Sequence, residues 1–431
     1  MDLLSFLDNS PVNFLAVKTL TEQLTAAGFQ SIDPREPMPK MKPGNGYFVT
    51  KNDSSLYAFR IGRKPLGEGG FHIICAHCDS PTFRIKPQAE MYQEGGVVKL
   101  NTEVYGGPIL STWMDRPLSL AGRVIVRGKD ALHPETRLLF VRRPLLVIPN
   151  LAIHFNRQVN DGVKLSKQKD MLPILAIIND ELERNNLLIN LIKEELSKTA
   201  DGKQVEILDF DLYLYDATPA CRLGLHDEFV SSGRLDDLSM VHAGLEAMLM
   251  ADKEPEVTQV LAIFDNEETG SQTKQGAASP FLSAMLQRMV LAQGGTPDDF
   301  YRSVEKAFMI SADNAHAWHP NYSEKYDPTN HPHMGGGPVI KINAAQKYAT
   351  DAHSAAVFAE VCREAGVPVQ YFVNHSDVAG GSTLGNILAS SLPVKGVDMG
   401  NPIWAMHSCR ETASMADHDY CIRAFTHFYN Q

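Results

Sequence analysis

The sequence contains no long apolar run. No stretch of the 431 residues approaches the ~20 consecutive apolar residues that a membrane-spanning helix needs. Residues Met1 to Leu7 include Asp2 and no basic side chain, so they do not resemble a secretory signal peptide. Six cysteines spread over a chain of this length do not resemble a disulfide framework. We therefore expect a protein of the reducing cytoplasm with no membrane association.

Positive charge is also scarce. The formal net charge is −11, and the sequence shows no basic patch or stripe of the kind that contacts nucleic acid. It shows no internal repeat and no low-complexity segment. An excess of acidic residues favours solubility and cationic ligands, a class that includes metal ions. We expect neither nucleic acid nor a membrane among the partners.

The order of the predicted elements indicates two domains, one inserted into the other. Strand-like and helical segments alternate before about residue 86 and again after about residue 225, which indicates an α/β sheet with helices on both faces. Between these points, short strand-like runs follow one another with turn residues between them, which is typical of an antiparallel unit. We therefore predict a discontinuous α/β domain, residues 1–86 and 226–431, and an inserted β-rich domain, residues 87–225.

Hydrophobic periodicity and turn residues place the individual elements. The expected helices are Val12–Gly28, one or two within Pro173–Leu196, Arg234–Met250 and one near Pro280–Ala292. The expected strands are Leu56–Ile61, Phe71–Ala76, Val97–Leu100, Leu118–Val126, Leu138–Val141, Leu145–Ile148, Val205–Tyr215, Val257–Phe264, Ala307–Ser311, Val367–Val373 and Val394–Met399.

Five short segments carry metal-binding side-chain types at the ends of these elements. They contain His77 with Asp79, Asp236 with Asp237, Glu267 with Glu268, Asp313, and His407. Ligands of open α/β sheets gather beyond the carboxyl ends of the strands, so we expect these side chains at one rim of the sheet.

Each segment also has an ordinary explanation when it is taken alone. Asp236 and Asp237 would stabilise the start of a helix, and Glu267 with Glu268 would do the same. His77 would be a hydrogen-bonded histidine at a strand end. Their joint occurrence at five element boundaries favours a single site.

The mixture of side chains fits a pair of zinc ions. Zinc binds histidine nitrogen and carboxylate oxygen, and a catalytic site keeps an open position for water. Two ions about 3.5–4 Å apart need a shared carboxylate, and the adjacent Glu267 and Glu268 can divide the roles of proton acceptor and ligand. Asp79 is placed to accept the spare N–H of His77. The predicted chemistry is hydrolysis by an activated water.

The pair Cys75-x-x-Cys78 suggests a redox motif or half of a zinc knuckle. A second Cys-x-x-Cys is missing from the sequence, and positions three apart on an extended strand face opposite sides. We therefore do not predict a redox role for this pair.

Six motifs, in order along the chain, resemble those of the aspartyl aminopeptidase family in a bacterial-type member. They are AHCDSP, SGRLDD, FDNEETGS, SADNAHAWHPNY, GGGPVIKIN and MHSCRE, and the run LAIHFNR in the inserted block extends the resemblance to almost the whole chain. The resemblance implies a phosphorylase/hydrolase-like mixed sheet with helices on both faces, and an inserted β-rich dimerisation domain. It also implies two Zn²⁺ per subunit, for which Co²⁺ or Mn²⁺ can substitute. The activity it implies is removal of N-terminal residues, preferably Asp or Glu, from peptides with a free N-terminus, by a homo-dodecamer built from dimers.

The resemblance assigns roles to individual residues. The implied metal ligands are His77 and Asp313 for one zinc, Glu268 and His407 for the other, and Asp236 as the bridge between both. The implied catalytic residues are the general base Glu267 and Asp79, which orients a ligand. The implied substrate-binding residues are His154, His316 and Lys341. In this assignment His316 contacts the substrate carbonyl or oxyanion, Lys341 lies near the substrate pocket, and His154 reaches the active site of a neighbouring subunit. Cys78 and Asp237 stand where relatives often have Thr and Asn, and neither position is a metal ligand.

Several alternatives remain open at this point. Lys341 alone would be a surface lysine at a strand end, and His154 alone would be a histidine of the core. A related dinuclear-metal deacylase or carboxypeptidase would use the same ligand types. A catalytically inactive, self-assembling particle would form the same kind of assembly as the aminopeptidases without catalysing hydrolysis.

Overall fold

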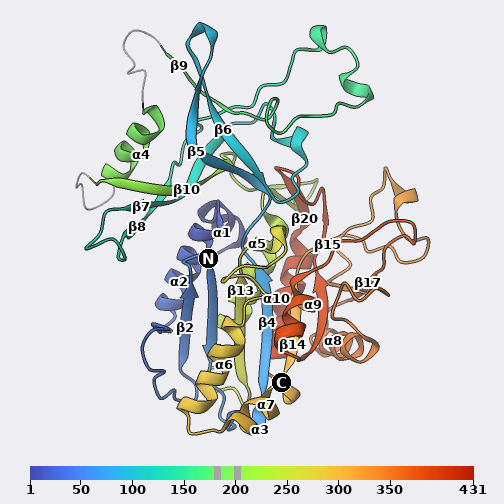
Figure 1. Ribbon diagram of the computed structural model, residues 1–431. Helices are drawn as coiled ribbons and strands as arrows, with labels where there is room; N and C mark the ends of the chain where they lie inside the picture. Colours follow the sequence, from blue (N-terminus) through green and yellow to red (C-terminus); the bar gives the residue numbers. More distant parts are fainter. Residues whose placement is uncertain (179–185, 199–204) are drawn as a thin grey trace. The chain divides into compact units, whose positions relative to one another are not determined.

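The computed structural model describes residues 1–178, 186–198 and 205–431 (Figure 1). Contacts divide the chain into two compact units. The first comprises Met1–Asp79, Ala220–Met406 and Glu411–Gln431, and the second comprises Ser80–Pro219 with the short return segment His407–Arg410. The contacts thus divide the chain after residues 79 and 219, whereas the sequence predicted the boundaries after residues 86 and 225.

A mixed sheet forms the centre of the first unit. Its nine strands in the described residues are, in spatial order, β1 (Gln30–Ser31), β2 (Gly46–Lys51), β3 (Ser55–Arg60), β13 (Thr258–Phe264), β4 (Phe71–His77), β14 (Phe308–Ala312), β18 (Lys395–Gly400), β16 (Val339–Lys341) and β17 (Gln370–Phe372). The four central strands β13, β4, β14 and β18 are parallel, while β3 and β16 are antiparallel to their inner neighbours. The carboxyl ends of the central strands consequently lie at one edge of the sheet.

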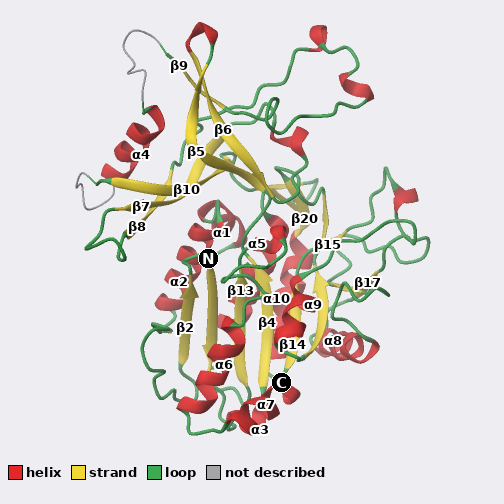
Figure 2. Cartoon of the chain, viewed as in Figure 1, coloured by secondary structure: helices red, strands yellow, loops and turns green. Residues whose placement is uncertain are grey.

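Helices cover both faces of this sheet, as Figure 2 shows. One face packs against α1 (Leu3–Asn9), α2 (Asn13–Ala26), α5 (Leu235–Met250), α8 (Ala352–Glu364) and α10 (Met415–Tyr429). The other packs against α3 (Leu66–Gly69), α6 (Phe281–Ala292), α7 (Pro297–Lys306) and α9 (Leu384–Ser391). The alternation of side chains along a strand divides the apolar run of β4 between the two cores, so Ile74 joins the first and Ile73 the second. The expected α/β class with helices on both faces is confirmed.

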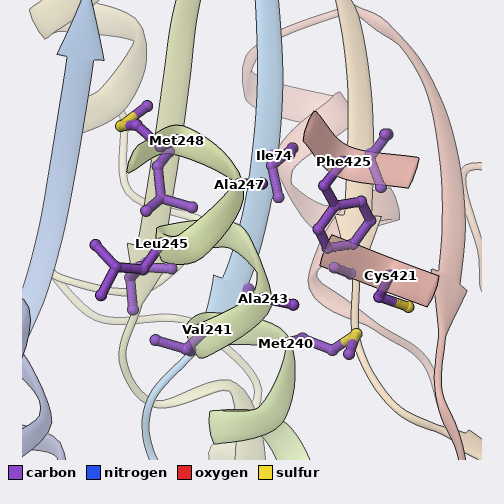
Figure 3. Packing of buried hydrophobic residues seen from close by; sticks show 14 of the residues in the cluster. Ile74, Met240, Val241, Ala243, Leu245, Ala247, Met248, Cys421 and Phe425 are labelled. Atoms are coloured by element: carbon purple, nitrogen blue, oxygen red, sulfur yellow. The ribbon is translucent and has the colours of Figure 1, made fainter. Parts of the chain in front are cut away.

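Helix α5 packs tightly against the sheet and beside α10. Figure 3 shows its apolar side chains beside Ile74 of β4 and beside Cys421 and Phe425 of α10. A Cβ atom added at Gly244 would come within 2.7 Å of the end of the Leu261 side chain on β13, so glycine lets the helix approach the strand without displacing that side chain. The tight packing fixes the start of α5 with respect to the strand ends.

A small sheet completes the first unit. In the described parts of the chain its order is β11 (Cys221–Leu223), β12 (Phe229–Ser232), β20 (Glu411–Ser414), β19 (Pro402–Trp404) and β15 (Ala315–His316).

An antiparallel sheet forms the second unit. Its strands, within the residues that are described, have the order β8 (Glu135–Phe140), β7 (Leu118–Val126), β10 (Ile207–Asp216), β5 (Thr82–Tyr92), β6 (Val97–Tyr105) and β9 (Ile174–Ile177). Helix α4 (Leu187–Ser197) contributes Leu188, Ile192 and Leu196 to its apolar core.

Of the predictions for this second unit, one is correct only in part and another is wrong. The segment Pro173–Leu196 is not helical throughout, because Ile174–Ile177 forms β9 and pairs with β6; its residues 179–185 lie outside the described residues. The expected strand Leu145–Ile148 contains only isolated bridges, from Leu146 to Leu118 and from Val147 to Ile174. In both places tertiary pairing decides the local structure.

The other predicted elements form within a few residues of their expected bounds. Elements that were not predicted are the helices α1, α3 and α7 to α10 and the strands β1, β2, β5, β11, β12, β15, β16, β19 and β20. No helix in the described part of the chain is both long enough and apolar enough to cross a membrane.

Candidate metal centre

His77 ends strand β4 with its imidazole buried and only 1% exposed. Its Nδ1 lies 3.1 Å from the main-chain oxygen of Asp79. A carbonyl oxygen only accepts hydrogen bonds, so Nδ1 carries a proton, and Nε2 is the nitrogen that would bind a metal ion after losing its own proton. Nε2 lies 3.6 Å from Oδ1 of Asp236 and 4.0 Å from Oε2 of Glu267.

The two adjacent glutamates follow β13 in a short 3₁₀ turn, Glu267–Thr269. Asn266 enters this turn with a φ of +61°. The carboxylate of Asp79 accepts the main-chain N–H groups of Glu267 and Glu268, each at 3.1 Å. Asp79 therefore holds the backbone of both glutamates as well as the ring of His77.

Asp236 and Asp237 lie where the chain turns into helix α5. Their dihedral angles are not helical, since ψ is 105° at Asp236 and φ is −121° at Asp237. Stabilisation of a regular first turn therefore does not explain this pair. The N–H of Asp236 donates to Oε2 of the buried Glu411 at 3.0 Å.

These segments bring donor atoms of the predicted types together. The triads His77–Glu267–Glu268 and His77–Asp236–Asp237 each have one ligand atom per residue, all within 4.8 Å of one another. The register of the sheet explains the convergence, because His77 on β4 is paired with Phe264, the last residue of β13.

The cluster concentrates negative charge in a buried place. Burial, with the neighbouring Asp313, Asp79 and Asp236 and against the opposing effect of His77, raises the pKa of Glu267 to about 8. Burial also raises the pKa of Glu268 well above its ordinary value. For His77, burial lowers the pKa, but the hydrogen bonds to Asp236 and Asp79 outweigh it and hold the pKa well above the usual range. Carboxylates crowded in this way bind a divalent cation well, and imidazole nitrogen with carboxylate oxygen is the donor set of zinc.

Asp313 follows β14 at the same edge of the sheet. Its Oδ1 accepts a hydrogen bond from the Lys341 ammonium at 3.0 Å. Lys341 is only 4% exposed, so the alternative of a surface lysine is wrong. Burial lowers the pKa of Lys341, but the Asp313 carboxylate outweighs this effect, and the net pKa lies above the ordinary value.

Comparisons with known proteins agree with this chemistry. Residues 6–429 match the family model for the aminopeptidase I zinc metalloproteases (M18). A probable M18 family aminopeptidase 2 of Clostridium acetobutylicum is 54% identical over 429 residues, which cover 99% of this chain and 98% of the relative. A protein with the same name from Ectopseudomonas mendocina is 44% identical and covers 99% of this chain and 97% of the relative.

This chain belongs to the M18 family of zinc metallo-aminopeptidases. It is a hydrolase that acts on peptide bonds.

Solved structures show the same fold. A structure of the Ape4 and Nbr1 complex is similar with a TM-score of 0.94 and 38% identity, covering 100% of this chain and 85% of that one. A structure of Chaetomium thermophilum mApe1 has a TM-score of 0.86 and 29% identity, covering 99% of this chain and 96% of that one. The S. cerevesiae mApe1 dodecamer has a TM-score of 0.84 at 24% identity, covering 99% of this chain and 95% of that one.

Three further predicted site residues of this M18 aminopeptidase lie on other segments of the chain. His316, on β15, is exposed, and its ring centroid lies 5.7 Å from that of Phe372. His407 belongs to the second unit, where its Nδ1 lies 3.1 Å from the main-chain oxygen of Gly107. His154 lies in a 3₁₀ turn of the same unit and is exposed, so the alternative of a core histidine is wrong.

The sequence did not reveal that Glu411 accepts the N–H of Asp236 or that Asp237 accepts the N–H groups of His77 and Asn314. Nor did it reveal that the Asn314 side chain donates to the main-chain oxygen of Leu235. Glu411 ends the motif MHSCRE, and Asp237 ends SGRLDD, so their place in these motifs was the available signal. Their hydrogen bonds to distant main-chain groups were not visible in any local pattern.

Proposed function

We propose that this M18 aminopeptidase removes N-terminal residues, preferably acidic ones, from peptides with a free N-terminus, at a site that holds two zinc ions. The proposed ligands are His77 and Asp313 for one ion, Glu268 and His407 for the other, and Asp236 for both. The observation that carries the proposal is the convergence of His77, Asp236, Glu267 and Glu268 in two overlapping triads of the first unit.

The charge balance supports two ions. Two divalent ions bring about four positive charges and the three ligand carboxylates remove about three. The remaining positive charge would make a water molecule at this site more acidic and so easier to activate for attack. Zinc, when bound, supplies a Lewis acid that polarises a carbonyl group and lowers the pKa of water to about 7.

Glu267 is the proposed proton carrier. It takes a proton from the attacking water and delivers it to the nitrogen of the leaving peptide as the bond breaks. Burial and the neighbouring carboxylates raise the pKa of Glu267 in the metal-free site, and bound zinc ions would lower it toward the ionised form that accepts a proton. Asp79 fixes it in place through the N–H of Glu267. His316, exposed on β15, is the proposed hydrogen-bond donor to the developing oxyanion.

Lys341 is the proposed recognition group for an acidic N-terminal side chain. An ammonium group has three N–H donors, and Asp313 uses one of them. The remaining two can bind a substrate carboxylate, while the pairing with Asp313 keeps the lysine charged.

The assembly is a further part of the proposal. The structural relative from S. cerevesiae is a dodecamer, and we infer a cytoplasmic homo-oligomer for this chain, a dodecamer built from dimers through residues 87–225. In that assembly His154 reaches the active site of a neighbouring subunit. Leu151, Ile153 and Phe155 around it are 59%, 51% and 81% exposed in the single chain, which supports an apolar contact there.

A panel of chromogenic substrates tests the activity. The purified, metal-loaded protein should hydrolyse Asp- and Glu-anilides fastest, neutral anilides more slowly, and N-acetylated anilides not at all. Preferred cleavage of the acetylated compounds would instead support the deacylase, and release of C-terminal residues from peptides would support the carboxypeptidase. No cleavage of any compound by protein with full metal content would support the inactive particle.

A further inference from the structure

Asp237 is completely buried, and each of its carboxylate oxygens accepts a main-chain N–H. Oδ2 accepts from His77 and Oδ1 from Asn314, both at 3.2 Å. Asp237 follows the proposed bridging ligand Asp236 directly, yet its side chain is engaged with two other segments of the chain.

Those two segments are the ends of the neighbouring strands β4 and β14. His77 is the last residue of β4, and Asn314 follows Asp313 beyond the end of β14. The hydrogen-bonded register between the two strands ends at the pair Cys75 and Ser311. Past that pair, the Asp237 carboxylate connects the two strand ends.

The connection spans the two proposed ligands of one zinc ion. His77 donates its own N–H to Asp237, and the other N–H belongs to the residue after Asp313. The separation of the two ligands determines whether they can hold one ion. A side chain that fixes both backbones therefore determines the geometry of that ion's site.

A direct role as a ligand is the alternative, because Asp237 has an oxygen within 4.8 Å of ligand atoms of His77 and Asp236. Its two oxygens, however, are already directed to main-chain N–H groups. Asp79 behaves in the same way, since its carboxylate accepts the N–H groups of Glu267 and Glu268. The same arrangement occurs twice, with a buried carboxylate holding the backbone of two site residues.

We propose that Asp237 is a positioning residue that sets the spacing between His77 and Asp313, and not a ligand of the metal. The inference rests on the proposed roles of His77 and Asp313 as ligands of one zinc.

Titration of the metal-free, full-length protein with Zn²⁺ against a chromophoric chelator tests this role. Asp237→Ala removes both hydrogen bonds and should weaken one of the two zinc sites by about 10–100-fold, the usual effect of losing a group that orients a ligand. Asp237→Asn should give an intermediate loss, because a carboxamide oxygen accepts one N–H and its NH₂ group accepts none. Unchanged affinity at both sites in Asp237→Ala would overturn the proposal.

Asp417 offers a matched control. It is also completely buried, and its two oxygens accept the N–H groups of Gly335 and Gly337. Asp417→Ala should lower the melting temperature as Asp237→Ala does and leave both zinc affinities at the wild-type value. An equal loss of zinc affinity in both variants would mean that general loosening of the fold explains the effect, and this would overturn the proposal.

The absorption spectrum of the Co²⁺-loaded protein separates positioning from ligation. Asp237→Asn should keep the wild-type band positions because the ligand set is the same, and it is the variant to use if Asp237→Ala does not fold. Shifted bands would show that Asp237 is a ligand. His77→Ala tests the proposed function separately: if it bound two zinc ions with wild-type affinity, the metal assignment would fail whatever Asp237 does.

Discussion

The ammonium nitrogen of Lys341 lies 3.0 Å from Oδ1 of Asp313, and both side chains are almost completely buried. Burial alone would lower the pKa of Lys341, but the carboxylate of Asp313 more than compensates for it. One ion pair therefore joins the proposed metal site to the proposed recognition group.

Replacing Lys341 should change substrate preference. Lys341→Met removes the charge and keeps most of the aliphatic volume. Since a hydrogen bond to a charged group contributes about 1.5–3 kcal/mol, the ratio of kcat/KM for Asp-anilide over Leu-anilide should fall roughly 10–100-fold. Lys347→Met is the control, because this nearby lysine donates to the main-chain oxygen of Gly380 and has no proposed contact with substrate. An unchanged ratio in Lys341→Met would remove Lys341 from substrate recognition.

The two adjacent glutamates should respond differently to the same substitution. Glu267→Gln should keep the metal content and lower kcat by two to four orders of magnitude, since general acid–base catalysis contributes about 10²–10⁴-fold. Glu268→Gln removes a proposed ligand and should lower the zinc content itself, as measured by atomic emission after dialysis. Near-normal turnover in Glu267→Gln, or full zinc content in Glu268→Gln, would contradict the division of roles.

Glu267 should contribute stability to the metal-free protein that is lost as pH rises from 4.5 to 8. Burial raises the pKa of Glu267 from 4.5 to about 8, so over this range the folded state binds a proton that the unfolded chain has released. The contribution is complete below pH 4.5 and is lost as pH passes 8. Thermal unfolding in chelator at several pH values measures it, and Glu267→Gln should reduce the slope. The same dependence of melting temperature on pH in the wild type and in Glu267→Gln would contradict this assignment.

Removal of metal should abolish activity reversibly. Chelation followed by gel filtration should leave an inactive protein, and added Zn²⁺ or Co²⁺ should restore hydrolysis. The increase in melting temperature produced by zinc should grow between pH 5 and pH 8, because protons compete with the ion for the buried carboxylates. Activity that survives complete removal of metal would exclude the metal-dependent mechanism.

The central strands and the position of the site followed from the sequence for one physical reason. Strands of a parallel sheet with both faces covered are continuous apolar runs, and Phe71–His77 and Thr258–Phe264 have that form. A polar residue directly after such a run lies at the edge of the sheet, which allowed His77 and Glu267 to be predicted as neighbours.

Other features depend on partners that no local pattern contains. The apolar run Ile174–Ile177 is compatible with a helix or a strand, and only pairing with Val97 and Val98 makes it a strand. The acceptors Glu411 and Asp237 bind main-chain N–H groups, which all residue types except proline carry. Their partners therefore cannot be recognised from residue type. Burial of Lys341 likewise depends on Asp313, 28 positions before it.

Mixing two inactive variants should restore activity if His154 acts in a neighbouring subunit. His154→Ala subunits keep an intact metal site and lack the donated histidine, while Glu267→Gln subunits lack the base and keep His154. When the two are dissociated and reassembled together, a His154→Ala site beside a Glu267→Gln subunit receives a functional histidine, so activity should rise above that of either parent. His133→Ala serves as the matched control in place of His154→Ala, because His133 is an exposed histidine of the same unit with no proposed role. It should be fully active without mixing. If the mixed assemblies were no more active than their parents, His154 would not act in the active site of a neighbouring subunit.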